Sequence, residues 1–250
     1  MRFAARFVST ILLLNVSVSL SSVVAAQPRQ AILVAAAADM QPLQNQLGSA
    51  FFRFAGGEVT FTFGASGSLA EQIRNGAPYD VYLSANDTFV KQLAESGYLI
   101  KDSIQVYGYG RLAIWSKSGR IHTLADLTAA TMQHLAIANP VHAPYGAAAQ
   151  AALRNQGLWD RLQPKLVYGE NVQQTLQYAE SGNADAAIVG WSQVFNKGGI
   201  LLPAAWHPRI SQTGGVVKGS RNPVLARRFM AFLTGRDGKA VLRQFGFDLP

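Results

Sequence analysis

Short apolar runs alternate with amphipathic stretches along most of the chain. The apolar runs are rich in Val, Ile and Ala and have the length of β-strands, while the stretches between them repeat apolar residues at helical spacing. This alternation predicts an α/β fold with largely parallel strands. We expect strands at residues 31–36, 58–63, 80–84, 110–115, 134–138, 165–168 and 185–189.

Capping residues predict where several helices begin and end. Ser68 followed by Glu71, and Asn171 followed by Gln174, have the spacing of capping boxes. One or two helices are expected over residues 222–245, where apolar residues recur on one face. Glycines that favour a left-handed C-terminal turn mark four further helix ends: Gly76, Gly97, Gly157 and Gly182.

The N-terminal segment has the layout of a secretory signal peptide. Arg2 and Arg6 precede a short apolar segment and small residues that end at Ala26. We therefore expect residues 1–26 to be removed after Ala26 and the mature protein to act in the periplasm. Asn15 and several serines interrupt the apolar segment, which argues against a membrane-spanning anchor.

Two extended stretches punctuated by glycine, residues 107–115 and 211–218, are candidates for crossings between two lobes. On this interpretation residues 27–107 and 214–250 form lobe one, and residues 108–213 form lobe two. The ligand would then bind in the cleft between the lobes.

The mature chain carries a net positive charge. Of 22 Lys and Arg residues, Arg2 and Arg6 leave with the signal peptide, so 20 basic residues face 14 acidic ones and the balance is +6. Such a surface raises the local concentration of anions. The basic residues are scattered and no nucleic-acid motif accompanies them, so no nucleic-acid partner is expected. The chain has no cysteine, which excludes disulfides, thiolate metal sites and a lipid-anchoring cysteine.

Four expected strand ends lead directly into helix starts made of small or polar residues. A helix N-terminus presents unpaired backbone N–H groups and the positive end of its dipole, so each junction can hold an anion. The carboxyl ends of strands gather at one edge of an α/β sheet, and two facing lobes would bring the junctions around one small cleft. Ser66 adds a hydroxyl donor to the second junction. The four junctions are residues 37–39, 64–68, 143–146 and 169–172.

At these junctions and in the segments around them the chain resembles the periplasmic molybdate-binding proteins of ABC transporters. The resemblance covers essentially all of the mature chain. It implies a two-lobed periplasmic-binding-protein type II fold and a monomer that captures molybdate or tungstate and delivers it to a membrane permease. It implies no enzymatic activity and no cofactor. The matching segments, in order, are residues 34–43, 63–73, 75–81, 139–146, 157–160 and 169–172.

In the family that the chain resembles, backbone N–H groups and hydroxyls hold the oxyanion, without a bare metal cation or a cationic side chain. Some members have Ser where this chain has Ala38, and some have Tyr where it has Gly190. Tyr145, which replaces a small residue of those members, is the candidate for the missing hydroxyl. Carried over to this chain, the oxyanion contacts fall on Ala38, Asp39, Ser66, Tyr145 and Val172.

Asp39 places a carboxylate at the junction where a dianion should sit. Like charges a few ångströms apart in a dry cleft repel strongly. We therefore expect the Asp39 N–H to face the ligand and its side chain to turn away, either capping the helix that begins near Met40 or pairing with a basic residue. Alternatively, Asp39 accepts a hydrogen bond from a protonated ligand, which would favour phosphate.

Other functions stay open at this stage. A sulfate, phosphate or ferric-ion binding protein is one alternative, although a ferric site would need clustered Tyr, His and carboxylate ligands that the junctions lack. An exported α/β hydrolase is another. Ser66 does not have a glycine on both sides at the spacing that a nucleophile elbow requires, and the histidines at 122, 134, 142 and 207 lack metal-ligand spacing.

Overall fold

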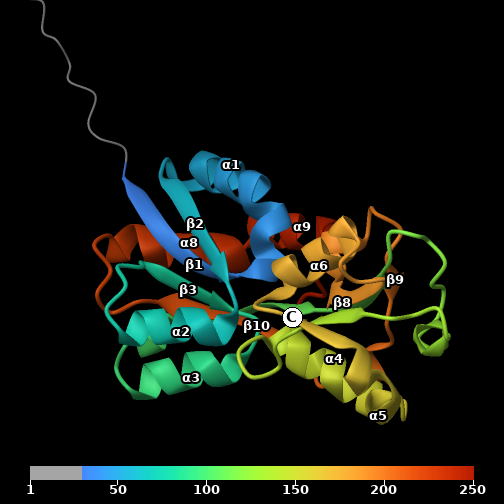
Figure 1. Ribbon diagram of the computed structural model, residues 1–250. Helices are drawn as coiled ribbons and strands as arrows, with labels where there is room; N and C mark the ends of the chain where they lie inside the picture. The colour runs from blue at the N-terminus through green and yellow to red at the C-terminus, as the bar shows by residue number, and fades with distance from the viewer. Residues whose placement is uncertain (1–29) are drawn as a thin grey trace, which may run out of the picture.

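The computed structural model describes residues 30–250, in which ten strands form two mixed sheets (Figure 1). The expected signal peptide lies outside the described residues. In the first sheet the strand order is β2-β1-β3-β10-β4. Strand β1 pairs in parallel with β2 and β3, and β10 runs antiparallel to β3 and β4. The strands are β1 (Ala31–Ala37), β2 (Glu58–Gly64), β3 (Val81–Ser84), β4 (Gln105–Gly110) and β10 (Ile210–Val216).

The second sheet has the order β7-β6-β8-β5-β9. Here β6 pairs in parallel with β7 and β8, and β5 is antiparallel to β8 and β9. The strands are β5 (Leu112–Trp115), β6 (Leu135–Ala138), β7 (Leu166–Gly169), β8 (Ala186–Gly190) and β9 (Ile200–Leu201).

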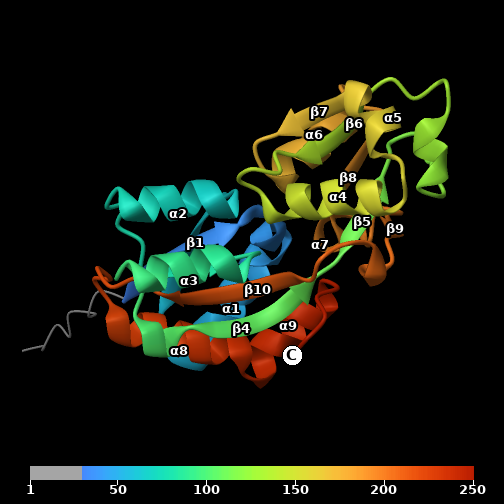
Figure 2. The same cartoon turned by 90° about the horizontal axis from the view of Figure 1, so that it is seen from below.

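Helices cover both faces of each sheet, so each sheet lies between two apolar layers and forms its own lobe (Figure 2). Among the described residues no helix combines the length and the apolar character needed to cross a membrane. Lobe one contains η1 (Ala38–Leu43), α1 (Gln44–Ala55), α2 (Ser66–Arg74), α3 (Asp87–Glu95), η2 (Lys101–Ser103), α8 (Pro223–Thr234) and α9 (Arg236–Gln244). Lobe two contains η3 (Ala125–Thr128), α4 (Pro144–Asn155), α5 (Trp159–Leu162), η4 (Gln163–Lys165), α6 (Val172–Ser181), α7 (Trp191–Val194) and η5 (Ala204–Trp206).

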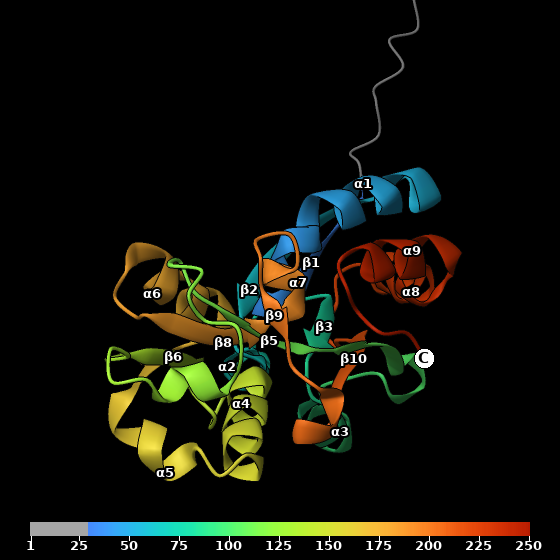
Figure 3. The ribbon, with the colours of Figure 1, turned by 90° about the vertical axis from the view of Figure 1, so that its right-hand side faces the viewer.

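The chain crosses between the lobes twice (Figure 3). Arg111 alone joins β4 to β5, and residues 202–209 lead from β9 back to β10. The lobe boundaries that we expected after residues 107 and 213 therefore fall within β4 and β10, because these two strands pair with each other in the first sheet.

All seven predicted strands are present, with ends shifted by no more than two residues. The first stretch that we interpreted as a crossing, residues 107–115, contains one at Arg111, between β4 and β5. The second stretch, residues 211–218, instead belongs largely to β10, which pairs with β4, and the return crossing precedes it. Strand β9 is too short to leave a pattern in the sequence. The expected C-terminal helical region is two helices, α8 and α9, separated at Gly235.

One of the two predicted capping boxes is confirmed in part. The Asn171 side chain caps α6 by accepting from the N–H groups of Gln173 and Gln174, whereas the Gln174 side chain accepts from Glu170 instead of Asn171. The box at Ser68 is wrong. Helix α2 begins two residues earlier, after an extended Ala65, so Ser68 lies inside the first turn. The four glycine helix ends are confirmed, each with a positive φ: Gly76 (83°), Gly97 (79°), Gly157 (67°) and Gly182 (85°).

Candidate ligand-binding site

The four junctions singled out by the sequence meet at one cavity between the lobes. All five candidate residues line it, together with neighbours in the same loops and Ala85 of lobe one. The cavity is small, about 10 Å³, close to the minimum room for one water. The lining residues are Ala37, Ala38, Asp39, Gly64, Ala65, Ser66, Ala85, Ala143, Pro144, Tyr145, Asn171 and Val172.

Strand register places the junctions side by side. In lobe one, Ala37 at the end of β1 lies opposite Gly64 at the end of the parallel strand β2, so η1 and α2 begin next to each other. In lobe two, Ala138 of β6 lies opposite Gly169 of β7, so α4 and α6 begin at the same edge. Each lobe therefore directs two helix N-termini toward the cavity.

The two lobes are in direct contact around this cavity. The N–H of Gly67 in α2 donates to the carbonyl of His142 at 2.9 Å, and the Ser68 hydroxyl lies 3.4 Å from a carboxylate oxygen of Glu170. Added to Gly67, a Cβ would lie 3.0 Å from that His142 oxygen, so a larger residue there would hold the lobes apart. The structure is thus a closed arrangement.

Ser66 presents a buried hydroxyl with an unused hydrogen. Its Oγ accepts from the N–H of Ala85 at 3.1 Å, and its carbonyl accepts from the Tyr82 hydroxyl at 2.7 Å. Among the described residues no acceptor pairs with the hydroxyl hydrogen. Ser66 can therefore donate to a ligand oxygen in the cavity.

Backbone donors surround the same space. Val172 is the first residue of α6, and the cap of Asn171 is used by the next two N–H groups, so the Val172 N–H stays available. Tyr145 is the second residue of α4, and Ala38 begins η1. These first-turn positions lack intrahelical acceptors in a regular helix.

Asp39 is fully buried where the lobes meet. Its Oδ2 accepts from the Tyr145 hydroxyl at 2.8 Å and from Nε2 of Gln212 at 2.7 Å, whereas Oδ1 has no partner among the described residues. Burial raises the pKa of Asp39 to about 7, because the hydrogen bonds from Tyr145 and Gln212, and from the backbone N–H groups of Asp39 and Met40, only partly offset the loss of water.

The partners that we expected for the Asp39 side chain are present in part. None of the described ion pairs includes the carboxyl group, so no basic residue pairs with it. At the start of η1 the backbone N–H groups of Asp39 and Met40 act on the carboxyl group and lower its pKa, as a capping role implies, while its side-chain donors come from α4 of the other lobe and from β10. The Asp39 carbonyl makes a further contact between the lobes by accepting from the Ser192 hydroxyl at 2.8 Å.

Tyr145 fills the space between the lobes because glycines face its ring. A Cβ on Gly110 would lie 2.1 Å from the Tyr145 hydroxyl, and one on Gly190 would lie 3.3 Å from the ring. Burial raises the pKa of Tyr145 well above its ordinary value, so the hydroxyl keeps its proton. The Tyr145 hydroxyl donates this hydrogen to the carboxyl group of Asp39. We expected this hydroxyl to replace the ligand donor that is missing at Ala38, but in the closed structure its hydrogen is directed at Asp39.

Gln212 is the functional candidate that our sequence analysis missed. Its Oε1 accepts from the buried Tyr107 hydroxyl at 3.0 Å, which turns Nε2 toward Asp39. The sequence signal was a single carboxamide inside an otherwise small and apolar stretch, and we interpreted that stretch as a lobe crossing.

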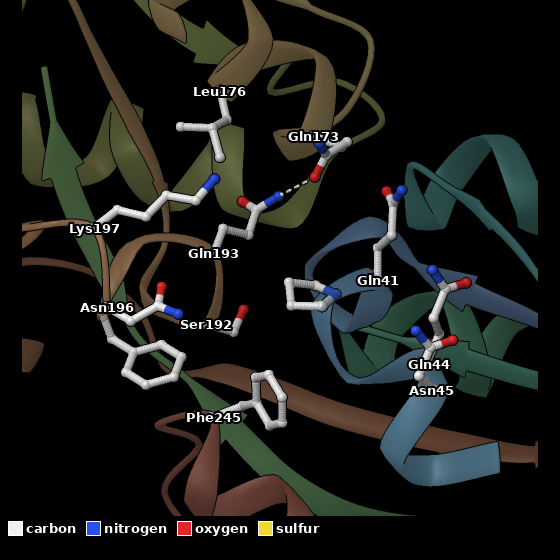
Figure 4. A pocket seen from close by; sticks show the side chains of 12 residues that line it. Gln41, Gln44, Asn45, Gln173, Leu176, Ser192, Gln193, Asn196, Lys197 and Phe245 are labelled. Atoms are coloured by element: carbon white, nitrogen blue, oxygen red, sulfur yellow. Dashed lines mark hydrogen bonds between the residues drawn. The ribbon is translucent and has the colours of Figure 1, made fainter. Parts of the chain in front are cut away.

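A larger cavity of about 390 Å³ lies beside the site, between η1–α1 and α6–α7 (Figure 4). Gln193 donates to Gln173 across one wall at 3.0 Å, and Lys197 is the only charged residue of the lining. None of the four junctions lines it, so the smaller cavity is the better candidate for an anion. In the described part of the chain no group of three or more His, Cys, Asp and Glu residues could hold a metal ion. The carboxamides of the larger cavity are Gln41, Gln44, Asn45, Gln173, Gln193 and Asn196.

Residues 32–248 match the family described as bacterial extracellular solute-binding protein. The chain belongs to this family. This solute-binding protein is 34% identical over 227 residues to the molybdate-binding protein ModA of Azotobacter vinelandii, covering 87% of this chain and 90% of the relative. It is 32% identical over 220 residues to ModA of Rhodobacter capsulatus, covering 86% and 87%.

Solved structures agree with this assignment. The periplasmic molybdate-binding protein of Azotobacter vinelandii superposes with a TM-score of 0.83 at 30% identity, covering 88% of this chain and 99% of that one. The sulfate-binding protein SubI of Mycobacterium tuberculosis superposes at 0.70 with 17% identity, covering 88% and 86%, which shows a common fold only. The predicted two-lobed α/β fold is therefore confirmed, and the family is one of transport proteins that bind solutes.

Proposed function

We propose that this solute-binding protein captures molybdate or tungstate in the periplasm and delivers it to the membrane permease of an ABC transporter. The observation that carries the proposal is the meeting of four helix starts and the Ser66 hydroxyl at one cavity between the lobes. The relatives named as molybdate-binding proteins support the choice of oxyanion. The protein would act as a monomer, without catalysis, cofactor or nucleic acid.

Neutral donors can hold a dianion when they are already oriented and water is excluded. The N–H groups at Ala38, Asp39, Tyr145 and Val172, with the Ser66 hydroxyl, supply such donors from both lobes. Asp39, Ser66 and Val172 are buried where the lobes meet, so the lobes must separate to admit a tetrahedral oxyanion and then close around it. The closed state gains contacts that neither lobe offers alone, and the ligand therefore favours it.

Thermal unfolding with different oxyanions tests the proposal. Molybdate and tungstate should raise the melting temperature, and a ligand at 100 times its Kd stabilises the folded state by about 2.7 kcal/mol. Sulfate and phosphate at the same concentration should have a much smaller effect. Equal stabilisation by sulfate would contradict the molybdate assignment, and no stabilisation by any oxyanion would contradict oxyanion binding altogether. Native mass spectrometry with elemental analysis would identify the ion carried by the purified protein.

A further inference from the structure

We propose that Asp39 takes up a proton when the lobes close on the oxyanion, so that ligand capture and proton uptake are coupled. This inference rests on the proposed function and concerns the same site. The proton comes from solvent and forms an O–H bond on the carboxyl group, which leaves no net charge on Asp39 beside the bound dianion.

The hydrogen-bond network defines which carboxyl oxygen takes the proton. Tyr107 donates to Oε1 of Gln212, which fixes the amide so that its Nε2 donates to Asp39. The Tyr145 hydroxyl donates to the same oxygen, Oδ2. Since Oδ2 already accepts two hydrogen bonds, the proton belongs on Oδ1, which is buried and has no partner among the described residues.

A bound oxyanion would supply the acceptor that this proton needs. Asp39 lines the same cavity as Ser66 and Val172, so an oxyanion in that cavity places oxygens beside the carboxyl group. An ionised Asp39 would repel a dianion there, because both charges would be shielded from water. A protonated Asp39 instead donates a hydrogen bond to it.

Among residues 30–250 no positive charge compensates an ionised Asp39. The groups that face the carboxyl group are the Tyr145 hydroxyl from α4, the amide of Gln212 from β10 and the backbone N–H groups of Asp39 and Met40, and all of them are neutral. The Tyr107 hydroxyl of β4 lies behind the Gln212 amide, and the Ser192 hydroxyl from α7 donates to the Asp39 main-chain carbonyl. The described ion pairs do not include the carboxyl group. Burial accordingly raises the pKa of Asp39 from the ordinary 3.8 to about 7.

The network forms between lobes, which links the proton to closure. Tyr145 belongs to lobe two, whereas Asp39, Gln212 and Tyr107 belong to lobe one. When the lobes separate, Tyr145 and Ser192 withdraw and water reaches the carboxyl group, whose pKa then falls toward 3.8. Between these two pKa values the closed form holds up to one more proton than the open form. Apparent affinity should therefore fall by up to about tenfold per pH unit as the pH rises through this window.

Calorimetric titration with sodium molybdate tests the coupling. Measurements at pH 6.5 in two buffers that are not oxyanions and that differ in enthalpy of ionisation give the number of protons taken up per ligand. We expect roughly half to one proton for the native protein. Asp39→Asn should reduce the uptake to near zero and leave the affinity nearly constant between about pH 6 and pH 8. Asp160→Asn, at an exposed position in lobe two, should retain the native uptake.

A second measurement does not depend on a variant. An infrared difference spectrum of the native protein, with and without molybdate, should gain the C=O band of a protonated carboxyl group. Molybdate binding without proton uptake would overturn the proposal. Equal proton uptake in a folded Asp39→Asn protein would also overturn it, because the proton would then bind to the ligand or to another group. Absence of molybdate binding to the native protein would overturn the proposed function as well.

Discussion

The Tyr145 hydroxyl donates a hydrogen bond of 2.8 Å to Oδ2 of Asp39, and the two residues belong to different lobes. Both side chains are buried where the lobes meet, and Gln212 donates to the same carboxyl oxygen. The contact exists only when the lobes are closed, so the stability of the closed state depends on the hydrogen bond between these two side chains.

Tyr145→Phe should weaken molybdate binding by about tenfold, because the closed state loses a hydrogen bond to an ionisable partner while the ring continues to fill the same space. Calorimetric titration measures the effect. Tyr168→Phe is the matched control, since Tyr168 is exposed in the same lobe, and its affinity should equal that of the native protein. Unchanged affinity in Tyr145→Phe would show that the contact does not stabilise the liganded state.

Ser66→Ala should weaken oxyanion binding by about tenfold or more, because a hydrogen bond to a charged group contributes roughly 1.5 to 3 kcal/mol. Ser68→Ala is the matched control in the same helix. The Ser68 hydroxyl makes only a long, exposed contact of 3.4 Å with Glu170, so its removal should change affinity little. Equal affinities of the two variants would refute a ligand contact at Ser66.

Gly110→Ala should prevent full closure. The new Cβ would lie 2.1 Å from the Tyr145 hydroxyl, which is incompatible with the closed position of that ring. We expect molybdate affinity to fall by at least about tenfold, which corresponds to roughly 1.4 kcal/mol. Small-angle scattering should show a more open shape in the presence of molybdate. Gly219→Ala, where a Cβ meets nothing within 4 Å, should behave like the native protein.

Asp39→Asn should stabilise the ligand-free protein at alkaline pH relative to the native protein. The pKa of Asp39 rises from 3.8 to about 7 on folding, so the folded state holds more protons than the unfolded state between these values. Its contribution to stability is fully present below pH 3.8 and is lost as the pH rises through about 7. The asparagine side chain of the variant does not titrate, so the variant does not lose this stability as the pH rises.

Thermal unfolding from pH 5 to pH 8 measures this difference. The advantage of Asp39→Asn should grow with pH and reach a few kcal/mol at most, because the lobes can open and return the native carboxylate to water. Asp160→Asn serves as the control and should show no pH-dependent difference. An advantage that is constant across this range would contradict burial of Asp39 in the folded, ligand-free protein.

The sequence alone determined seven of the ten strands, most helix ends and the junctions of the candidate site. These features depend on neighbours along the chain: apolar runs at residues 31–36 predict a strand, and a glycine such as Gly182 ends a helix through its own backbone freedom. Predictions from such local patterns are correct here because few contacts with distant parts of the chain favour a different local structure. The capping prediction at Ser68 failed because α2 begins at Ser66, directly after the end of β2 at Gly64 and an extended Ala65.

Only the tertiary structure decided what Asp39 does. Its partners Tyr145 and Gln212 lie 106 and 173 residues away in the chain, and no local pattern indicates which donors will surround a carboxyl group buried between two lobes. The sequence could place Asp39 at a helix start, but its burial and its pKa depend on closure of the second lobe. The exact strand pairing of β4 with β10, which moved the lobe boundaries, is likewise a contact between segments about 100 residues apart.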